Sequence, residues 1–483
     1  MHPIENYPFK FKPFMHQLAS LNASWDKEEF ALLMDMGTGK TKVTIDTISM
    51  LWDAGKIDGA LVIAPKGVYR NWSDLELPTH LPDHIRSNAR IGYWTPSPNK
   101  KEKEQIEWLF YPNDDLNIFC MNVEALSTEK GVRFAERFLL GHKTIMVIDE
   151  STCVKNPGAR RTKSCLSLGK KAKYRRILTG SPVTKSPLDL YSQCSFLDWH
   201  LLGFSSYFSF RNRYAVLKQQ NFGGRTIHQV VGYRNLEELA EKIKPFSFRV
   251  TKDECLDLPE KIFVKRTVEM TDEQKKLYAD MKRNAIASLS SGLITTTAVI
   301  VQLLRLHQIV CGFIKTDEGE ELDLPSNRLS SLMEILDETS GKVIIWANYR
   351  RNIAMIEQAI AKEYGKESVV TYYGDTTGED RELAKTKFQD PDSPVKYFVA
   401  NAQTGGYGIT LTQANTVIYY SNNYDLEKRL QSEDRAHRIG QKHNVTYIDM
   451  VTPDTVDEKI LAALRDKNDI ARMLTGDAWR SWI

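Results

Sequence analysis

The stretch Leu33–Thr41, LMDMGTGKT, contains the residue types that bind phosphate. An apolar run leads into a glycine-rich turn, and a helix-forming segment follows. Glycines let the backbone come close to a phosphate, and the N–H groups of such a turn then point at its oxygens. A lysine after the turn reaches the β- and γ-phosphates, and the next hydroxyl can ligate Mg²⁺. The stretch predicts a nucleotide site formed by Gly37, Thr38, Gly39, Lys40 and Thr41.

One position departs from the usual phosphate-binding pattern, GxxxxGK[ST], because Met34 stands where its first glycine would be. The alternative interpretation is a flexible turn with a surface lysine. FKPFMHQ, which precedes the stretch, ends at Gln17. An amide can pair a donor and an acceptor with an adenine edge, so we expect Gln17 to bind the base. By itself Gln17 would be an ordinary surface glutamine.

A pair of carboxylates, Asp149 and Glu150, ends the apolar run TIMVIDE. Carboxylates at the end of a buried strand are costly unless they bind something. Beside a phosphate-binding loop, Asp149 would hold Mg²⁺ together with Thr41, and Glu150 would orient or deprotonate the attacking water. The alternative is an ordinary strand end entering solvent, and the phosphate-binding loop upstream argues against it.

Two arginines, Arg435 and Arg438, lie three residues apart in LQSEDRAHRIGQKHNV. Asp425 is a suitable N-cap, and the pattern predicts a helix from there to Gly440. Gln431, Arg435 and Arg438 would then share one face at i, i+4 and i+7. On an isolated helix these arginines would be solvated, with Glu433 and Asp434 as partners. Opposite a nucleotide site they would instead bind the γ-phosphate.

Short apolar runs alternate with helix-like stretches, which is typical of buried parallel strands in an α/β fold. This alternation of strand-like and helix-like segments is interrupted over residues 197–247 and 270–325, and it resumes after each interruption. We therefore expect two α/β lobes, residues 1–260 and 261–483, each carrying a helical insert, with helices at the C-terminal end. A proline interrupts an extended run at DLPEKIFVKRT, the predicted join.

Composition excludes several classes of protein. The 483 residues are 42% hydrophobic, which argues against disorder, and the net charge of +3 requires any DNA contact to be local. The six cysteines include no CxxC pair, so we predict free thiols in a reducing compartment and no zinc site. The opening MHPIENYPFKFKPF lacks a signal-peptide core, and no apolar run reaches membrane-spanning length. We expect an intracellular protein without membrane contact.

The motifs, taken in order, resemble those of the Swi/Snf-related ATPases of helicase superfamily two, in a compact form similar to bacterial and bacteriophage members. They are FKPFMHQ, DMGTGKT, LVIAPKGVYRNW, VIDESTCVKNPGAR, RRILTGSPVTKSPLDLYSQCSFL, KVIIWANYRRNI, YYGDTTGEDRELAKTKF, GGYGITLTQANTVIYYS and SEDRAHRIGQKHNVTYIDMVT. The resemblance covers nearly the whole chain. It implies two RecA-like lobes that close on ATP and Mg²⁺, with Gly408 at the nucleotide and Arg435 and Arg438 completing the site. It also implies duplex DNA lying across both lobes.

The sequence departs from the family at several positions. Ser151 and Thr152 replace the common Ala-His after the acidic pair, which puts in doubt the route from the ATP site to the DNA-facing LTG motif. FRVTK stands where relatives often have two adjacent arginines, and Tyr424 replaces a usual tryptophan. Gln403 and Thr404 replace a common Arg-Ala.

Translocation on any DNA sequence requires contacts to phosphates and not to bases. We expect these contacts in turns at strand ends, where backbone N–H groups suit phosphate oxygens; the alternative for each is a plain turn. The candidates are Lys66, Asn122, Thr179, Gly180, Gly374, Gln403, Thr404 and Gly405. Tyr93 and Trp94, near a lysine cluster, would be either a stacking platform or part of an edge strand.

The expected function is a DNA-dependent ATPase that translocates on duplex or branched DNA and remodels what it meets. Fork reversal, branch migration, strand reannealing and displacement of bound protein are suitable activities, with roles in repair or recombination. Replication or repair proteins would be its partners, and we expect a monomer. The compartment would be the cytoplasm of a bacterial or phage-infected cell, or the nucleus of a eukaryote. The alternatives are a strand-separating DNA or RNA helicase and a DNA-binding scaffold without hydrolysis.

Overall fold

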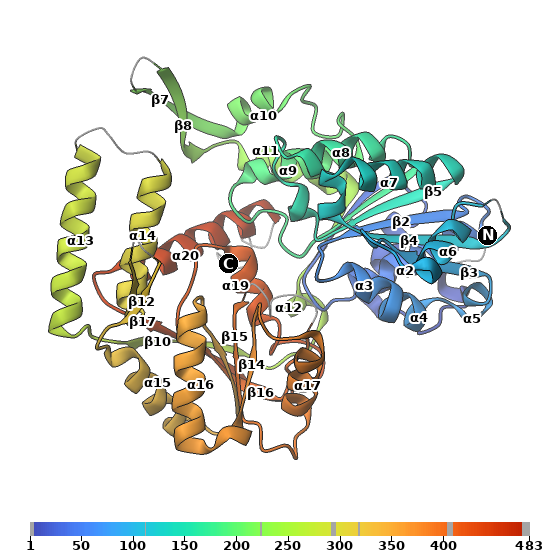
Figure 1. Cartoon of the computed structure of the whole chain (residues 1–483). Coiled ribbons are helices and arrows are strands. Elements are labelled where there is room, and N and C mark those ends of the chain that lie inside the picture. The colour runs from blue at the N-terminus through green and yellow to red at the C-terminus, as the bar shows by residue number, and fades with distance from the viewer. Residues whose placement is uncertain are drawn as a thin grey trace. The chain divides into compact units, whose positions relative to one another are not determined.

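The computed structural model describes the chain except for residues 1–3, 112, 223–224, 291–295, 317–318, 403–408 and 476–483. The chain divides into two compact units, residues 1–257 with 467–483 and residues 258–466. Each unit has its own parallel sheet with helices on both faces, so the predicted α/β class is confirmed (Figure 1). In the described part of the chain, no helix is long and apolar enough to cross a membrane.

The first unit contains a seven-stranded sheet in the order β3-β4-β2-β5-β6-β1-β9, in which every pairing is parallel. Its strands are β1 (Glu29–Met34), β2 (Gly59–Ala64), β3 (Ala89–Tyr93), β4 (Leu116–Asn122), β5 (Thr144–Asp149), β6 (Tyr174–Leu178) and β9 (Ser247–Val250). Because all strands run in one direction, their carboxyl ends meet at one edge.

Helices cover both faces of this sheet. They are α1 (Met15–Ser24), α2 (Lys40–Asp53), α3 (Tyr69–Asn71), α4 (Leu77–His80), α5 (Asp83–Arg86), α6 (Lys100–Trp108), α7 (Glu129–Gly141), α8 (Arg160–Gly169), α9 (Leu190–Leu197), α10 (Tyr207–Tyr214), α11 (Leu236–Ile243) and α12 (Lys252–Cys255). Short helical turns are η1 (Ile4–Asn6), η3 (Val123–Ser127), η4 (Ser151–Val154), η5 (Pro187–Asp189) and η6 (Lys244–Phe246), and η2 (Trp72–Glu76) is a π-helix.

Strand β2 shows how the sheet is buried. Leu61 and Ile63 point into the core formed with α7, α8 and α9, whereas Ala60 and Val62 point into the core formed with α1, α2 and α4. All six residues of β2 are buried. This explains why the strand is apolar throughout and does not alternate with polar residues.

The structure corrects the helical insert expected over residues 197–247. The segment contains an antiparallel hairpin of β7 (Ala215–Phe222) and β8 (Arg225–Tyr233), which projects from the first unit between α10 and α11 (Figure 1). The sequence explains the hairpin, because Gly-Gly separates two runs that contain β-branched residues, and this pattern is a common hairpin signal.

The second unit contains a six-stranded sheet in the order β10-β17-β16-β13-β15-β14, again parallel at every pairing. Its strands are β10 (Lys261–Thr267), β13 (Lys342–Trp346), β14 (Val369–Tyr372), β15 (Tyr397–Ala400), β16 (Ala414–Tyr419) and β17 (Val445–Val451). Two further short strands, β11 (Phe313–Lys315) and β12 (Glu321–Asp323), form a separate hairpin.

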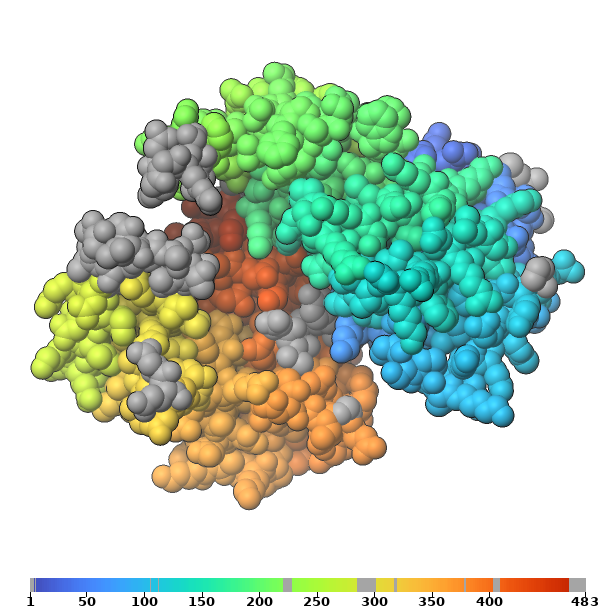
Figure 2. Space-filling model, turned by 45° about the horizontal axis from the view of Figure 1, so that its top comes forward, coloured from blue at the N-terminus to red at the C-terminus, as the bar shows by residue number. Residues whose placement is uncertain are grey.

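The helices of the second unit include two long ones within the expected insert. They are α13 (Asp272–Ser290) and α14 (Thr296–Val310), followed by α15 (Asn327–Glu338), α16 (Arg350–Tyr364), η7 (Lys366–Ser368), α17 (Gly378–Gln389) and α19 (Leu426–Glu433). Helix α20 (Val456–Thr475) begins in this unit, and its residues from 467 on are grouped with the first unit. Helices α15 and α16 pack on one face of the sheet and α17 on the other. Figure 2 shows the yellow α13–α14 segment continuous with the orange surface of the same unit.

Candidate active site

The predicted phosphate-binding loop connects β1 to α2 at the carboxyl edge of the first sheet. Gly37 and Gly39 have φ angles of 78° and 93°, a left-handed conformation that favours glycine. A Cβ atom on Gly39 would lie 2.2 Å from Nε2 of Gln17, so a larger residue would also collide with this side chain. Nε2 of Gln17 donates to the carbonyl of Thr38 at 3.1 Å. The sequence motif and the glutamine upstream of it are therefore brought together.

The lysine of this loop is buried. Lys40 is 8% exposed, and its Nζ donates to the carbonyls of Met34 and Asp35 at 2.8 and 3.1 Å. These carbonyls mark the carboxyl end of β1, so the ammonium lies where the loop begins. Thr41 follows in the first turn of α2. A positive charge and a hydroxyl thus lie together at the loop, as the motif predicts.

The acidic pair lies at the same edge, at the end of β5. Asp149 is 7% exposed; its Oδ2 accepts a hydrogen bond from Nε1 of Trp72 at 2.9 Å, and its Oδ1 accepts one from the backbone of Glu150. Burial raises the pKa of Asp149, while the Trp72 indole, the charge of Lys40 and the Glu150 backbone oppose that rise. The Asp149 carboxylate is therefore buried close to the lysine of the phosphate-binding loop.

Glu150 has a strained backbone. Its φ of 46° lies in the left-handed region, which non-glycine residues rarely adopt. Such residues cost about 1–3 kcal/mol and cluster at active sites, where the surrounding structure holds them in place. Here the residue directly follows a buried strand and precedes η4. The strain supports a functional role for this glutamate.

Three further contacts at this edge were not predicted from the sequence. Nε2 of His16 lies 2.8 Å from the carbonyl of Thr38. Arg249 pairs with the carboxylate of Asp35 at 3.0 Å and donates to the carbonyl of Gly180 at 3.1 Å, so it joins two loops of this edge. Trp72 is the third. Its only signal in the sequence is the pair NW after APKG, and the π-helix that it begins is a form often found at functional sites.

The nucleic-acid candidates of the first unit all follow strands at this edge, but their exposure differs. Lys66 is exposed after β2, and Asn122 ends β4, where its amide donates to Glu124 at 3.1 Å. Thr179 and Gly180 are buried after β6, and the Thr179 hydroxyl accepts from the backbone of Ser181 at 3.1 Å. The side chain of Thr179 thus shapes its own loop.

Of the nucleic-acid candidates in the second unit, the structure describes one. Gly374 is exposed after β14, and its carbonyl accepts from Arg381 at 3.0 Å. The other three nucleic-acid candidates of this unit, Gln403, Thr404 and Gly405, lie outside the described residues, as does the nucleotide-binding candidate Gly408. A cavity of about 380 Å³ lies at the carboxyl edge of this sheet. Among its lining residues are Asn348, Asn401 and Tyr424, which follow β13, β15 and β16.

The predicted helix through the two arginines is wrong beyond Glu433. Asp425 does cap α19, because its side chain accepts from the backbone of Lys428 at 3.4 Å, but the helix ends at Glu433. The hydroxyl of Tyr447 donates to the Glu433 carbonyl at 2.8 Å, and the backbone of Leu411 donates to the next segment at Arg435. The helical hydrogen bond that is lost is the one from the backbone of Arg435 to the Gln431 carbonyl, because that carbonyl accepts from the Arg435 guanidinium and the backbone of Arg435 donates to the carbonyl of Ser432 at 3.4 Å.

The two arginines consequently have different environments and do not share a helical face. Arg435 is 8% exposed; its guanidinium donates to the carbonyls of Gln431 and Ile409 at 2.9 and 3.0 Å. Arg438 is only partly buried. Glu433, expected to pair with the arginines on a solvated helix, is instead bonded to Arg429 and Lys261 at 2.8 and 3.1 Å. Arg435 holds this segment in place, and Arg438 is the more accessible guanidinium.

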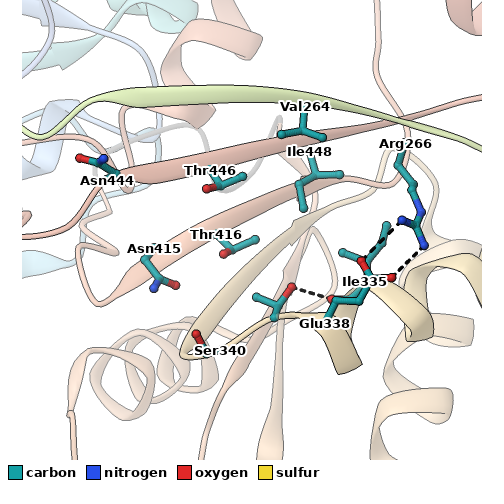
Figure 3. A pocket seen from close by; sticks show the side chains of 11 residues that line it. Val264, Arg266, Ile335, Glu338, Ser340, Asn415, Thr416, Asn444, Thr446 and Ile448 are labelled. Carbon is teal, nitrogen blue, oxygen red and sulfur yellow. Dashed lines mark hydrogen bonds and ion pairs between the residues drawn. The ribbon is translucent and has the colours of Figure 1, made fainter.

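Trp94 and a cavity in the second unit do not belong to the predicted site. Trp94 is 4% exposed and packs edge-on against Phe134, so the structure favours the edge-strand interpretation over a stacking platform. A cavity of about 360 Å³ lies in the second unit. Asn415, Thr446 and the ion pair of Arg266 with Glu338 are among its lining residues (Figure 3). The cavity lies over the amino-terminal halves of β16 and β17, away from the carboxyl ends that bear the candidates.

Metal-binding side chains are not clustered in the part of the chain that the structure describes. All six cysteines are free, as predicted. Among the described residues, no group of three or more His, Cys, Asp or Glu side chains is arranged to hold a metal ion.

Comparison with known proteins identifies the regions that carry these motifs. Residues 16–313 match the SNF2-related domain, and residues 327–440 match the helicase conserved C-terminal domain. YwqA of Bacillus subtilis, named as an ATP-dependent helicase/translocase, is 28% identical over 451 residues, which are 90% of this chain and 45% of that protein. The chromatin structure-remodeling complex subunit snf21 of Schizosaccharomyces pombe is 26% identical over 468 residues, with coverages of 90% and 36%.

A solved structure also matches most of the chain. The Sulfolobus solfataricus SWI2/SNF2 ATPase core in complex with dsDNA is 28% identical, with coverages of 98% of this chain and 95% of that one and a TM-score of 0.43. The chain spans less than half the length of the curated relatives that it matches.

Proposed function

Since the chain belongs to the SNF2-related family, whose domain matches more than half of it, we propose that it hydrolyses ATP and uses the energy to translocate on duplex or branched DNA. The observation that carries this proposal is that a buried lysine and a buried carboxyl group lie at the same sheet edge. Lys40 and Asp149 come from different strand ends, and the lysine charge favours the ionised form of the carboxyl. A cation for phosphates beside a carboxylate for Mg²⁺ is the arrangement that nucleotide hydrolysis requires.

Different residues at this edge would bind the phosphates, the base and Mg²⁺. The N–H groups of the Gly37–Thr41 loop and the Lys40 ammonium would bind the phosphates, and Gln17 would reach the base. The Thr41 hydroxyl and the Asp149 carboxylate would hold Mg²⁺, which favours a few protein oxygens together with phosphate oxygens. When bound, the ion neutralises charge on the phosphates. Glu150 would orient the attacking water and accept its proton.

The DNA-facing part of the proposal rests on the strand-end turns. Lys66 and Asn122 are accessible at the carboxyl edge of the first sheet, and Gly374 is accessible at that of the second. Turns of this kind offer backbone N–H groups and a lysine charge to phosphates, without a base-reading surface. Contacts to the sugar-phosphate backbone alone suit movement along any DNA sequence.

Arg438 would complete the hydrolytic site as an arginine finger. It is more accessible than Arg435, whose guanidinium is bonded to two carbonyls of its own unit. Guanidinium charge that reaches the γ-phosphate only when the two lobes close would make hydrolysis conditional on closure. A stepping motor needs this condition, because otherwise ATP is hydrolysed without movement.

One set of measurements tests the proposal. ATP turnover is measured without nucleic acid and with single-stranded, duplex, forked and four-way DNA and with RNA, followed by displacement of a triplex-forming strand. Duplex-stimulated turnover with triplex displacement is expected. Separation of a forked duplex would favour the strand-separating helicase. DNA binding without ATP turnover would favour the non-hydrolysing scaffold.

A further inference from the structure

The residue after the catalytic glutamate candidate makes a buried contact that no motif predicts. Ser151 begins η4 directly after Glu150 and has no exposed surface. Its hydroxyl donates to Oε1 of Gln193, on α9, at 2.6 Å. The two residues are 42 positions apart, so the contact is a product of the tertiary fold.

The same glutamine holds the loop that follows β6. Nε2 of Gln193 donates to the carbonyl of Pro182 and to the carbonyl of Asp189, both at 2.8 Å. Pro182 directly follows Thr179–Ser181, a strand-end turn that contains two nucleic-acid candidates from the sequence, both buried, and the partly exposed Ser181. One amide therefore links the acidic motif to this turn through Ser151, Gln193 and Pro182.

Burial makes the link specific. Gln193 has no exposed surface, and a buried amide that loses a partner is left with an unsatisfied polar atom, at a cost of about 1–3 kcal/mol. The amide uses its oxygen for Ser151 and its nitrogen for the loop. A displacement of Ser151 or of Pro182 would therefore displace the other residue or break a hydrogen bond of Gln193.

A second contact ties the far end of the loop to the same acidic segment. Nζ of Lys155, which follows η4, donates to the hydroxyl of Thr184 at 2.6 Å. The carboxylate of Asp189 accepts from the backbone of Thr184 and Lys185 at 3.1 and 2.8 Å. The loop is thus hydrogen-bonded to the acidic segment near Thr184, in addition to the link through Gln193 at Pro182.

We propose that Ser151 and Gln193 are positioning residues that couple the Thr179–Pro182 turn to Glu150. Nucleic acid bound at the turn would set the backbone of Glu150 through the hydroxyl–amide link, and ATP bound at the site would act on the turn by the same link. This inference rests on the proposed DNA-stimulated ATPase. It assigns to the neutral Ser151 the connection for which the DEST motif lacks a histidine.

The test compares Ser151→Ala, Gln193→Leu and the double variant with a matched control, Ser195→Ala. Ser195 lies on the same helix, and its hydroxyl bonds back to the carbonyl of Tyr191 at 2.7 Å, outside the link. ATP turnover is measured with and without duplex DNA. The affinity for duplex DNA is measured with and without a non-hydrolysable ATP analogue, and folding is checked by thermal unfolding.

The expected result is a loss of coupling with basal turnover kept. DNA stimulation should fall about fivefold or more in both single variants. The analogue should also lose its effect on DNA affinity, because both effects depend on the same link between the two sites. The double variant should be no worse than the singles, because both remove one interaction. Ser195→Ala should behave as the wild type.

Other outcomes overturn the inference. Wild-type stimulation in Ser151→Ala contradicts the coupling, and an equal loss of basal and stimulated turnover indicates a merely structural role. If Gln193→Leu does not fold, Ser151→Ala decides, because it removes a single hydroxyl. A wild-type protein that DNA does not stimulate contradicts the proposed function itself, and the coupling falls with it.

Discussion

The indole nitrogen of Trp72 donates a 2.9 Å hydrogen bond to the carboxylate of Asp149, from a π-helix to the end of a buried strand. The bond keeps a carboxylate oriented in a place where burial favours the protonated form. Lys66, a DNA-contact candidate, lies six residues before this tryptophan. The hydrogen bond thus attaches the segment after β2 to the proposed metal ligand.

Trp72→Phe should reduce ATP turnover about tenfold or more, because a hydrogen bond to a charged group contributes about 1.5–3 kcal/mol. The Mg²⁺ requirement should rise, since the unsupported Asp149 carboxyl binds its proton more tightly. Turnover is measured against Mg²⁺ concentration. Trp52→Phe, in a partly buried tryptophan of the same unit, is the control and should keep the wild-type requirement. An unchanged Mg²⁺ requirement in Trp72→Phe would remove the indole from this role.

Lys40→Ala and Glu150→Gln should both abolish ATP hydrolysis, for different reasons. Lys40→Ala removes the buried ammonium of the phosphate-binding loop and should weaken ATP binding as well. Glu150→Gln removes only the carboxylate that activates water, so ATP should still bind. Turnover and the binding of a fluorescent ATP analogue are measured together. Lys12→Ala, at an exposed lysine, serves as control. Near wild-type turnover in either variant would refute its assigned role.

The two arginines should separate in function and stability. Arg438→Ala should lower DNA-stimulated turnover by about 10³–10⁵, the range of an arginine finger, with unfolding and DNA binding little changed. Arg435→Ala should lower the free energy of unfolding by about 1–3 kcal/mol, because the carbonyls of Gln431 and Ile409 lose their donor. Denaturant unfolding and turnover are measured for both. A turnover defect confined to Arg435→Ala would reverse the assignment.

His307 should make stability depend on pH at alkaline values. Burial lowers the pKa of this imidazole, but Cys311 and Asp457 outweigh burial and raise it to about 10. A pKa raised above the ordinary value of ~6.5 gives stability that is complete below pH ~6.5 and lost as the pH rises to about 10. The free energy of unfolding should therefore fall from pH 7 to 9.

Asp457 does not share this window. Burial alone would raise its pKa, yet Arg328 and His307 hold it below the usual range, so its contribution is lost only as pH falls through acidic values. Urea unfolding of the wild type, His307→Gln and the control His443→Gln at pH 7, 8 and 9 tests the prediction. His307→Gln should flatten the slope, and the exposed His443 should leave it unchanged. An equal slope in all three proteins would exclude His307 as its source.

Local patterns predicted the parts of the site that are continuous in the chain. The turn before Lys40 and the carboxylates after TIMVI need only a strand followed by a turn, and parallel pairing then brings the strand ends to one edge. The helix through Arg435 was mispredicted for the opposite reason. Its sequence permits a helix, but the Arg435 guanidinium occupies the carbonyl of Gln431, and the backbone of Leu411 donates to the carbonyl of Arg435.

Short-range patterns were enough to predict the α/β class, the phosphate-binding loop and the acidic strand end, and the order of the motifs along the chain was enough to identify the family. The side chains that support these motifs became visible only in the folded chain. Trp72 meets Asp149 across 77 positions, and Ser151 meets Gln193 across 42. Folding brings the partners of such a buried hydrogen bond together from distant parts of the chain, so the bond cannot be predicted from their spacing in the sequence. The DEST motif indicated that the usual contact between the acidic motif and the loop after β6 is changed in this chain. The contact that connects them, through Gln193 on α9, could be found only in the folded structure.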